Sequence, residues 1–310
     1  LGVTALTSVV AVTGGFQDAF RERVLGVNSH ILVIKHGIDF RNYREVQKKI
    51  EDVEGVKATS PFILHEMIAT HGKRSGGVLV KGIEPSTFER VSDIPKYTRE
   101  GGALQKLNYD RFPEDGKKAV PGILIGHHLA DDLGLEKGER VRLTSPLENL
   151  DPDKWTSSNH APSTNEFEVV GIYSSGFYEY DSRLMMVDYR ALQDFFNRGD
   201  VVRGIDVRVH DVFAVGTLKN HIDAAIEGDH FRILDWKDLN KNLFTSLGLQ
   251  RLVLAVLFCF IVLVASFNII ATLVMIVLDK RKDIAILKSM GATNFGITLI
   301  FMIQGLMIGA

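Results

Sequence analysis

Histidines and carboxylates that stand side by side are the first residues of this 310-residue chain that could do chemistry. His127 and His128 form one pair, and Glu66 follows His65. Imidazole and carboxylate groups can hold a metal ion, but neighbouring side chains on a helix or a strand point in different directions. Solvent-exposed histidines are therefore the simpler interpretation of both pairs.

Two further clusters also have simple interpretations. Asp131 with Asp132, and Glu114 with Asp115, could act as general acid and base only if the fold placed them in one pocket. Solvated acids are the simpler interpretation, because nothing in the sequence brings the pairs together. Core packing beside a β-turn is the simpler interpretation of a later aromatic cluster, which comprises Phe177, Tyr178 and Tyr180 next to Glu179 and Asp181.

The sequence lacks the motifs of several common catalytic sites. It has no G-x-x-x-x-G-K-[ST] phosphate-binding loop, no H-E-x-x-H or C-x-x-C zinc signature, and no G-x-S-x-G nucleophile elbow. Its formal net charge of −2 gives no basic bias toward nucleic acid. We therefore predict a protein that is not an enzyme, holds no cofactor of its own and binds no nucleic acid.

A long uncharged run near the C-terminus predicts a membrane protein. Residues 252–278 comprise 27 positions without a charged side chain, and a helix of about 20 residues crosses a bilayer core. A buried core helix is the alternative, but such helices rarely run so long without a charge. We predict a transmembrane helix at residues 251–278.

Residues 1–16 and 295–310 are also free of charge. We interpret these runs as the end of a first transmembrane helix and the start of a third, in a fragment of a longer protein. A signal peptide is the alternative for the first run, which lacks the basic region such peptides carry. The loop 279–294 between the later runs holds Lys280, Arg281, Lys282 and Lys288. Basic short loops lie in the cytoplasm, so residues 17–250 are expected on the opposite side.

Strand and helix patterns divide this outer segment into parts. Residues 28–99 show a strand, a helix at residues 43–53 with Val46, Ile50 and Val53 on one face, and further strands. A β-α-β pattern returns in residues 201–238. We expect these two parts to form one α/β subdomain, and residues 100–200 to form a second, β-rich subdomain. Apolar residues at four-residue spacing predict stalk helices at residues 17–27 and 239–250. The predicted fold class is thus α-helical transmembrane segments with an α+β outer domain.

Two stretches from Val264 onward read VASFNIIATLVMIVLDKRKDIAILKSMGAT and IFMIQGLMIG. They resemble the permeases of the bacterial lipoprotein-releasing (Lol) ABC transporter. Four segments nearer the N-terminus also resemble this family and occur in the family's order. They are ALTSVVAVTGGF, ILIGHHLADDLGLEKGERVRLTSP, VVGIYSSGFYEYDSRLMMV and the pattern W-x-x-L-N-x-x-x-F that starts at Trp236. The wider superfamily, which includes macrolide-exporter and cell-division permeases, shares mainly the DI-x-x-L-x-x-x-GA loop.

The resemblance implies a multi-pass protein of the bacterial inner membrane, with a periplasmic domain made of an α/β porter part and a β-rich sabre part. It implies a dimer of ATPase subunits that binds ATP and Mg, and a second permease that is the same or a related chain. Lipoproteins would leave the membrane lipids for a periplasmic chaperone. An efflux or cell-division permease is the nearest alternative. A membrane sensor is more distant, because the basic loop leads straight into another apolar run.

The loop at 279–294 is the first of three candidate sites. Helical spacing places Ile284, Leu287 and Gly291 on one face, and Gly291 can end the helix. The resemblance makes this segment a coupling helix that docks on the ATPase, although a plain basic membrane anchor is the alternative. Its candidate contact residues are Lys282, Asp283, Ile284, Leu287, Lys288, Met290, Gly291 and Ala292.

The second candidate site is an apolar cavity for lipoprotein acyl chains. Apolar residues recur at helical spacing in the outer half of the second transmembrane helix, and the end of the first could complete the wall. Contact with membrane lipid is the alternative for each residue. The candidates are Val9, Val12, Phe16, Leu254, Leu257, Phe258, Ile261 and Val264.

The third candidate site is the polar segment at residues 146–165, which two strand-like segments bracket. Long irregular segments inside a domain are usually functional or disordered. In the resembling permease that recruits the chaperone, a hook with the sequence P-S-x-x-x-F stands here, and Pro162, Ser163 and Phe167 match it. Trp155 is a candidate interface anchor. The family's hook is basic near its tip, whereas here Lys154 is surrounded by Glu148, Asp151 and Asp153. Two alternatives therefore remain open: this segment is merely a flexible loop, or a partner permease carries the hook.

Overall fold

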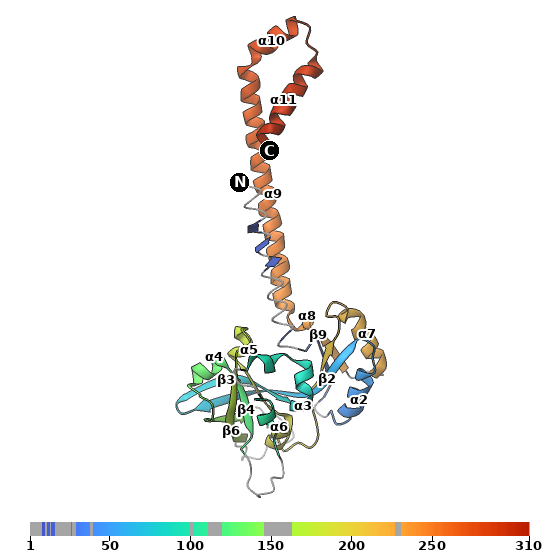
Figure 1. Ribbon diagram of the computed structural model, residues 1–310, viewed down its shortest axis with the longest axis vertical. Coiled ribbons are helices and arrows are strands. Elements are labelled where there is room, and N and C mark those ends of the chain that lie inside the picture. The colour runs from blue at the N-terminus through green and yellow to red at the C-terminus, as the bar shows by residue number, and fades with distance from the viewer. Residues whose placement is uncertain are drawn as a thin grey trace, which may run out of the picture. The chain divides into compact units, whose positions relative to one another are not determined.

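The computed structural model describes residues 8–9, 11–12, 14–15, 26, 29–37, 40–98, 102–110, 120–145, 163–226 and 231–309. The chain divides into two compact units (Figure 1). Val9–Asn240 forms the globular unit, and Leu1–Ser8 with Lys241–Ala310 forms the helical unit. Phe16, Trp155 and Pro162 lie outside the described residues, as does nearly all of the predicted stalk at 17–27.

One mixed sheet organises the globular unit, in the strand order β3-β7-β4-β6-β5-β2-β8-β1-β9. Because β3 also pairs with β2, the six strands from β3 to β2 close into a hydrogen-bonded ring. Strands β8, β1 and β9 continue from β2 outside that ring. The strands are β1 (Ile31–Lys35), β2 (Val56–His71), β3 (Arg74–Ile83), β4 (Gly122–Gly126), β5 (Arg140–Ser145), β6 (Ser163–Tyr173), β7 (Leu184–Asp188), β8 (Gly204–Val209) and β9 (Phe231–Asp235).

Strand β2 belongs to both halves of the sheet. Its first part, from Val56 to Phe62, pairs antiparallel with β8. Its second part pairs with β3 from Phe62 to His71, and with β5 around Ala69. We call the ring of β2, β3, β7, β4, β6 and β5 the barrel half, and β8, β1 and β9 with their helices the α/β half. The boundary between the two predicted subdomains at residue 100 stays a prediction. Hydrogen bonds of the barrel half cross this boundary, because β3 pairs with β7.

Two amphipathic helices cover the α/β half. Helix α2 (Tyr43–Glu51) buries Tyr43, Val46 and Ile50, which the helical repeat places on one face. Helix α7 (Val215–Ile226) contacts both α2 and β9, and Figure 1 shows the two helices together at one end of the unit. The helix predicted at residues 43–53 is confirmed as α2, but α2 ends at Glu51 and does not reach Val53.

The barrel half has its own apolar interior. Alternate residues of β5 and β6 point inward, including the fully buried Val141 and Phe167, which face each other across the two strands. Four short helices cover the strands, and α6 contacts β2, β3 and β6. They are α3 (Pro85–Val91), α4 (His127–Leu133), α5 (Tyr178–Asp181) and α6 (Tyr189–Phe195).

Strands β5 and β6 form a hairpin around residues 146–162, with Ser145 opposite Ser163. The prediction that strands hold the ends of this segment together is confirmed. Its predicted end at residue 165 is wrong, because β6 already begins at Ser163. The hydroxyls of Thr144 and Thr164 lie 3.2 Å apart across the ladder. Residues that look like turn formers in the sequence thus extend the strand through cross-strand pairing.

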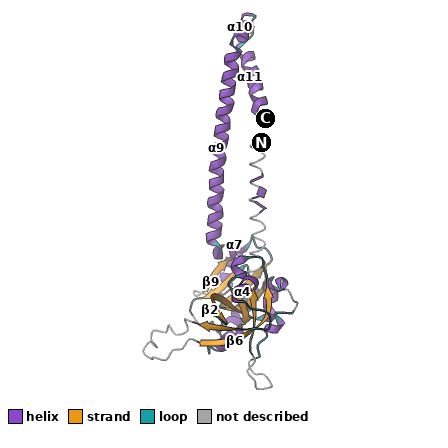
Figure 2. Ribbon diagram, turned by 90° about the vertical axis from the view of Figure 1, so that its left-hand side faces the viewer, coloured by secondary structure: helices purple, strands orange, loops and turns teal. Residues whose placement is uncertain are grey.

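The described part of the helical unit contains α9 (Lys241–Asp279), α10 (Arg281–Ser289) and α11 (Asn294–Gly309). The predicted stalk at 239–250 and the predicted transmembrane helix at 251–278 form one continuous helix, α9, which begins at Lys241. Leu239 instead ends a short separate helix, α8 (Trp236–Leu239). Among the described residues, one helical stretch, Gly248–Asp279, is long and apolar enough to cross a membrane. Helix α11 turns back beside α9 (Figure 2), where a Cβ at Gly305 would lie 3.2 Å from Leu273 Cδ1.

Candidate functional site

Helix α10 has defined ends. Asp283 lies in the first turn, where a carboxylate favours the positive end of the helix dipole, and it accepts a hydrogen bond from Lys280 Nζ at 3.0 Å. At the other end Gly291 has a φ of +94°. The N–H of Ala292 donates to the carbonyl of Leu287 at 3.0 Å, and the N–H of Gly291 donates to that of Lys288 at 3.1 Å. This is a Schellman motif, so the prediction that Gly291 ends the helix is confirmed.

An exposed apolar surface lies on α10. Ile286, Leu287 and Met290 are 59%, 42% and 79% exposed, and at 100° per residue they fall within an arc of about 100°. We call these three residues the loop patch. Ile284 borders it and is partly buried. Our sequence reasoning omitted Ile286, although its four-residue spacing to Met290 was the signal that could have found it.

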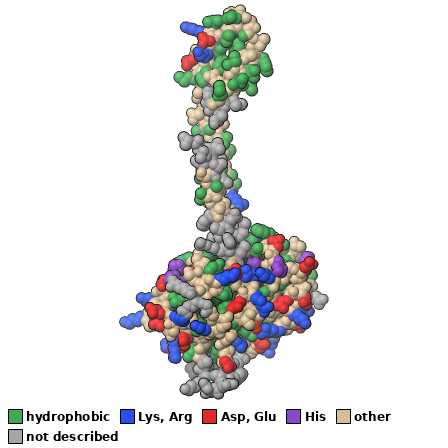
Figure 3. Space-filling view, viewed as in Figure 1, with side chains coloured by type: hydrophobic (Ala, Val, Ile, Leu, Met, Phe, Trp, Pro, Cys, Tyr) green, Lys and Arg blue, Asp and Glu red, His purple; other side chains and the backbone are tan. Residues whose placement is uncertain are grey.

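Charged side chains border the loop patch. Lys282 and Lys288 are both exposed. The hydrogen bond that Lys280 donates to the carboxylate of Asp283 raises the pKa of Lys280. Figure 3 shows hydrophobic side chains at the surface around α10 and α11, next to a small charged group. A short helix with an apolar face and basic neighbours is suited to an apolar groove with an acidic rim.

The α9 residues of the expected acyl-chain cavity follow one another along the helix. Leu257, Ile261 and Val264 are more than half exposed, and Leu254 and Phe258 are partly buried. Val9 and Val12, which belong to the globular unit, are also exposed. The cavity stays a prediction, because its two walls lie in different units.

The expected hook residues divide into two groups. Trp155 and Pro162 lie outside the described residues, and Ser163 is the first residue of β6. Phe167 is fully buried, with its ring centroid 6.5 Å from that of Phe195. Its side chain therefore supports the base of the hairpin and does not face a partner.

The remaining chemical candidates of the sequence form no metal site among the described residues. His127 and Asp131 lie 3.5 Å apart on α4, and the ring of His128 packs on Tyr178 with centroids 5.1 Å apart. The turn before α5 is ordered by Asp181, whose carboxylate accepts hydrogen bonds from the backbone N–H and the hydroxyl of Ser175. The packing interpretation of the aromatic cluster holds only in part. Phe177 and Tyr180 are partly buried, with ring centroids 5.2 Å apart, whereas Tyr178 is 66% exposed and begins the short helix α5. Glu114 and Asp115 lie outside the described residues.

Comparison with known proteins assigns the two units to one kind of permease. A family model described as the MacB-like periplasmic core domain matches residues 1–225, and one described as FtsX-like permease C-terminal matches residues 255–310. The chain belongs to the MacB-like permease family. It is thus a membrane protein with a periplasmic domain, and the globular unit is that domain.

The curated relatives of this MacB-like permease agree with the sequence resemblance. The lipoprotein-releasing system transmembrane protein LolC of Xylella fastidiosa (strain Temecula1) is 28% identical over 309 residues, which cover 100% of this chain and 70% of the relative. LolC of Neisseria meningitidis serogroup B is also 28% identical, over 312 residues that cover 100% of this chain and 71% of the relative. LolE of Haemophilus influenzae is 26% identical over 318 residues, with the same two coverages. The resemblance to Lol permeases is therefore confirmed.

Solved structures of this kind are more distant from this MacB-like permease. The periplasmic region of MacB from Actinobacillus actinomycetemcomitans is 13% identical, with a TM-score of 0.40, over 70% of this chain and 94% of that structure. The family assignment consequently rests on the sequence models and the curated relatives.

Proposed function

We propose that this protein is the permease subunit of a transporter that extracts lipoproteins from the bacterial inner membrane. ATP would be hydrolysed by a separate pair of ATPase subunits, and the lipoprotein would pass to a periplasmic chaperone. The chain itself would be a non-catalytic, multi-pass subunit that works beside a second permease. The observation that carries this proposal is the loop patch, an exposed apolar surface on a well-ended helix at the predicted cytoplasmic loop.

The loop patch would transmit the ATPase cycle to the periplasmic domain. Residues Ile286, Leu287 and Met290 would fill a groove of the ATPase, and Lys282, Asp283, Lys288 and the Gly291-Ala292 stop would fix the helix in it. Helix α9 ends at Asp279, two residues before α10 begins at Arg281, and it runs without a break back to Lys241. An unbroken helix of 39 residues can carry a displacement along its length. We further propose that residues 28–99 and 201–238 form the porter part and residues 100–200 the sabre part, with β2 and β3 of the porter part completing the barrel half.

A charge in the loop patch should uncouple ATP hydrolysis from transport. We expect Leu287→Asp to lower lipoprotein release at least about tenfold, because a carboxylate in an apolar groove is costly to desolvate. Ala285→Asp is the matched control, since Ala285 is exposed on the opposite side of α10 and should leave release within about twofold. Release and ATPase activity are measured with the full transporter in proteoliposomes. Normal ATPase binding and transport by Leu287→Asp would refute the docking role.

The proposed substrate path comprises the acyl-chain cavity and the hook. Acyl chains would contact the outer part of α9 at Leu254, Leu257, Phe258, Ile261 and Val264, since each buried CH₂ contributes about 0.8 kcal/mol. Val9, Val12 and Phe16 would complete the wall. The segment at 146–162, with Trp155 and Pro162, would meet the chaperone together with Ser163 at the start of β6, while Phe167 anchors its base.

Photo-crosslinking separates these two roles. A crosslinker at position 257 should capture lipoprotein, and one at position 155 should capture the chaperone. A crosslinker at Lys137, an exposed residue of the periplasmic domain, is the control and should capture neither. Crosslinks only to phospholipid at position 257 would remove the cavity from the mechanism. Capture there of a small efflux substrate would favour an exporter of the same superfamily.

A further inference from the structure

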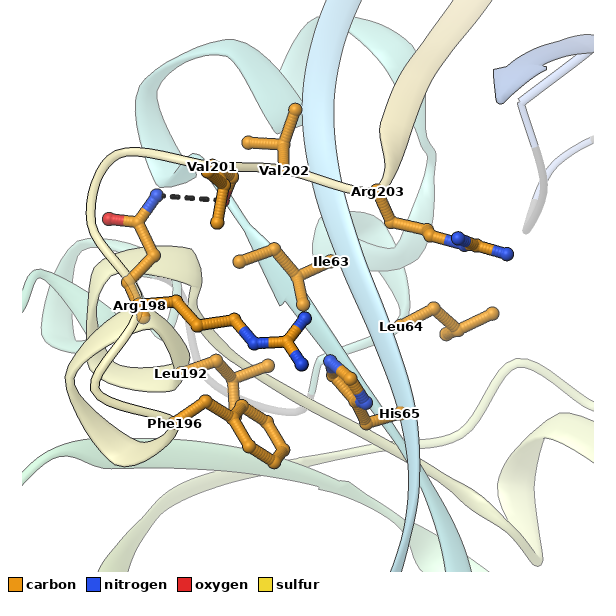
Figure 4. Close-up of a pocket in the computed structure, with 10 residues that line it drawn as sticks. Ile63, Leu64, His65, Leu192, Phe196, Arg198, Val201, Val202 and Arg203 are labelled. Atoms are coloured by element: carbon orange, nitrogen blue, oxygen red, sulfur yellow. Dashed lines mark hydrogen bonds between the residues drawn. The ribbon is translucent and has the colours of Figure 1, made fainter. Parts of the chain in front are cut away.

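A pocket of about 340 Å³ lies between strand β2 and helix α6 in the periplasmic domain. Its apolar wall comes from both elements and from the chain after α6, with Ile63, Phe196 and Val202 among the lining side chains (Figure 4). Its polar groups include His65, Arg198 and Arg203. The size lies at the lower end of the range for small-molecule sites, so it suits a compact ligand better than a long acyl chain.

The pocket is basic. No acidic residue is among those that line it. The guanidinium group of Arg198 points across the pocket toward His65, whereas Arg203 lies at the other edge and donates a hydrogen bond to the carbonyl of Gly37 at 3.0 Å. Within the described part of the chain, neither arginine forms an ion pair. Asp200, which follows α6, instead accepts a hydrogen bond from the hydroxyl of Tyr43 at 2.7 Å.

His65 contributes a neutral ring to this pocket. Burial, followed by the charges of Arg198 and Arg203, lowers the pKa of His65 to about 4. Its ring packs on Phe196, with centroids 4.2 Å apart. At neutral pH the ring therefore extends the apolar wall and keeps one donor and one acceptor nitrogen, while Arg198 supplies the positive charge.

We propose that this pocket binds a small carboxylate that carries an aromatic ring or a short alkyl chain. The carboxylate would accept two hydrogen bonds from the planar guanidinium of Arg198, a geometry that this group matches well. The ring or chain would lie against Phe196, Ile63 and Val202. A dianionic phosphate fits less well, because its three oxygens would meet one inward-pointing guanidinium and a largely apolar wall.

Such a ligand would connect two parts of the barrel half. Ile63 and His65 lie on β2, the strand that both halves of the sheet share, and Phe196 and Arg198 directly follow α6. Ligand binding would therefore hold α6 against β2 and stabilise this end of the barrel. This inference does not depend on the proposed transport function.

The test uses the full chain in lipid nanodiscs and two ¹⁹F probes that differ in charge. We expect 4-fluorophenylacetate to show saturable line broadening, and its neutral amide, 4-fluorophenylacetamide, to bind at least about tenfold more weakly. Empty nanodiscs correct for partitioning into lipid. Arg198→Met should weaken binding of the acetate about tenfold or more, whereas Arg142→Met, a change at an exposed arginine of β5, should leave it within about twofold.

Three results would overturn the proposal. The first is equal binding of 4-fluorophenylacetate and its amide, and the second is unchanged binding of 4-fluorophenylacetate to Arg198→Met. The third is that inorganic phosphate displaces 4-fluorophenylacetate at the same concentration as unlabelled phenylacetate does. If Arg198→Met fails to fold, Arg198→Lys keeps the charge but loses the planar fork. Arg198→Lys should then bind 4-fluorophenylacetate several-fold more weakly than the native chain does. Unchanged binding by a folded Arg198→Lys protein would also overturn the proposal.

Discussion

Phenylalanine side chains occupy opposite environments in the two units of this permease. In the periplasmic domain Phe88 and Phe167 are almost completely buried, whereas Phe260 and Phe267 on α9 are 62% and 64% exposed. Removing such a side chain from water stabilises a fold by about 1.5–3 kcal/mol, which the domain gains from its own core. Among the described residues nothing covers these side chains of α9, so lipid or further protein segments must cover them. The same residue type therefore builds a core in one unit and an interface in the other.

The largest expected effect compares two phenylalanines directly. Phe167→Ala should lower the free energy of unfolding of the periplasmic domain by about 3–5 kcal/mol, because it leaves a cavity in the barrel half. Phe267→Ala should change it by less than about 0.5 kcal/mol. Urea unfolding in nanodiscs, followed by the fluorescence of the buried Trp236 in a Trp155→Phe background, measures both. Equal effects of the two substitutions would contradict the contrast between the units.

The next effect compares two ion pairs of similar length. In the periplasmic domain Lys81 Nζ lies 2.7 Å from Asp206 Oδ2, and both groups are largely buried. In the loop Lys280 Nζ lies 3.0 Å from Asp283 Oδ2, and both groups are exposed. Lys81→Met should lower the free energy of unfolding by about 3 kcal/mol, since it leaves the Asp206 carboxylate buried and without a countercharge.

Lys280→Met is the matched control for this comparison. It should leave unfolding of the periplasmic domain unchanged, because solvent screens an exposed pair. The double substitution Lys81→Met, Asp206→Asn tests the cause of the loss. It should recover part of the stability, because the buried charge is then gone. No recovery would point to lost packing of Lys81, whose ammonium lies 5.1 Å from the ring centroid of Phe62.

The smallest expected effect is a pH dependence that belongs to the periplasmic domain alone. His65 has a pKa of about 4 in the folded protein, well below its usual value of 6.5. The unfolded chain therefore binds this proton more readily, so the contribution of His65 to stability is complete above pH 6.5 and is lost as the pH falls toward 4. At pH 5 the loss should be about 1 kcal/mol, with allowance for solvent screening.

His65→Leu isolates that contribution from the other histidines. The free energy of unfolding of the variant should fall less between pH 7 and pH 5 than that of the native chain. Urea unfolding at the two pH values gives the difference. An identical fall in both proteins would show that His65 is protonated as easily in the folded state as in the unfolded chain.

The sequence alone determined the features that depend on local periodicity and composition. The uncharged run predicted α9, the spacing of Val46 and Ile50 predicted α2, and Gly291 predicted the end of α10. Each of these features involves residues within a few turns of one helix, so a short stretch of sequence contains the information. The order of five family segments likewise carried the resemblance to Lol permeases.

Only the tertiary structure decided which distant strands share a sheet. Strand β3 pairs with β7, which closes the barrel half across the boundary predicted at residue 100. Ser29 donates a hydrogen bond to Asp206 over a separation of 177 residues, and Asp206 also meets Lys81. Burial of Phe167 and the basic pocket at His65 arise in the same way. Strand pairing and burial depend on register between segments far apart in the chain, and the alternating pattern within one strand does not contain that register.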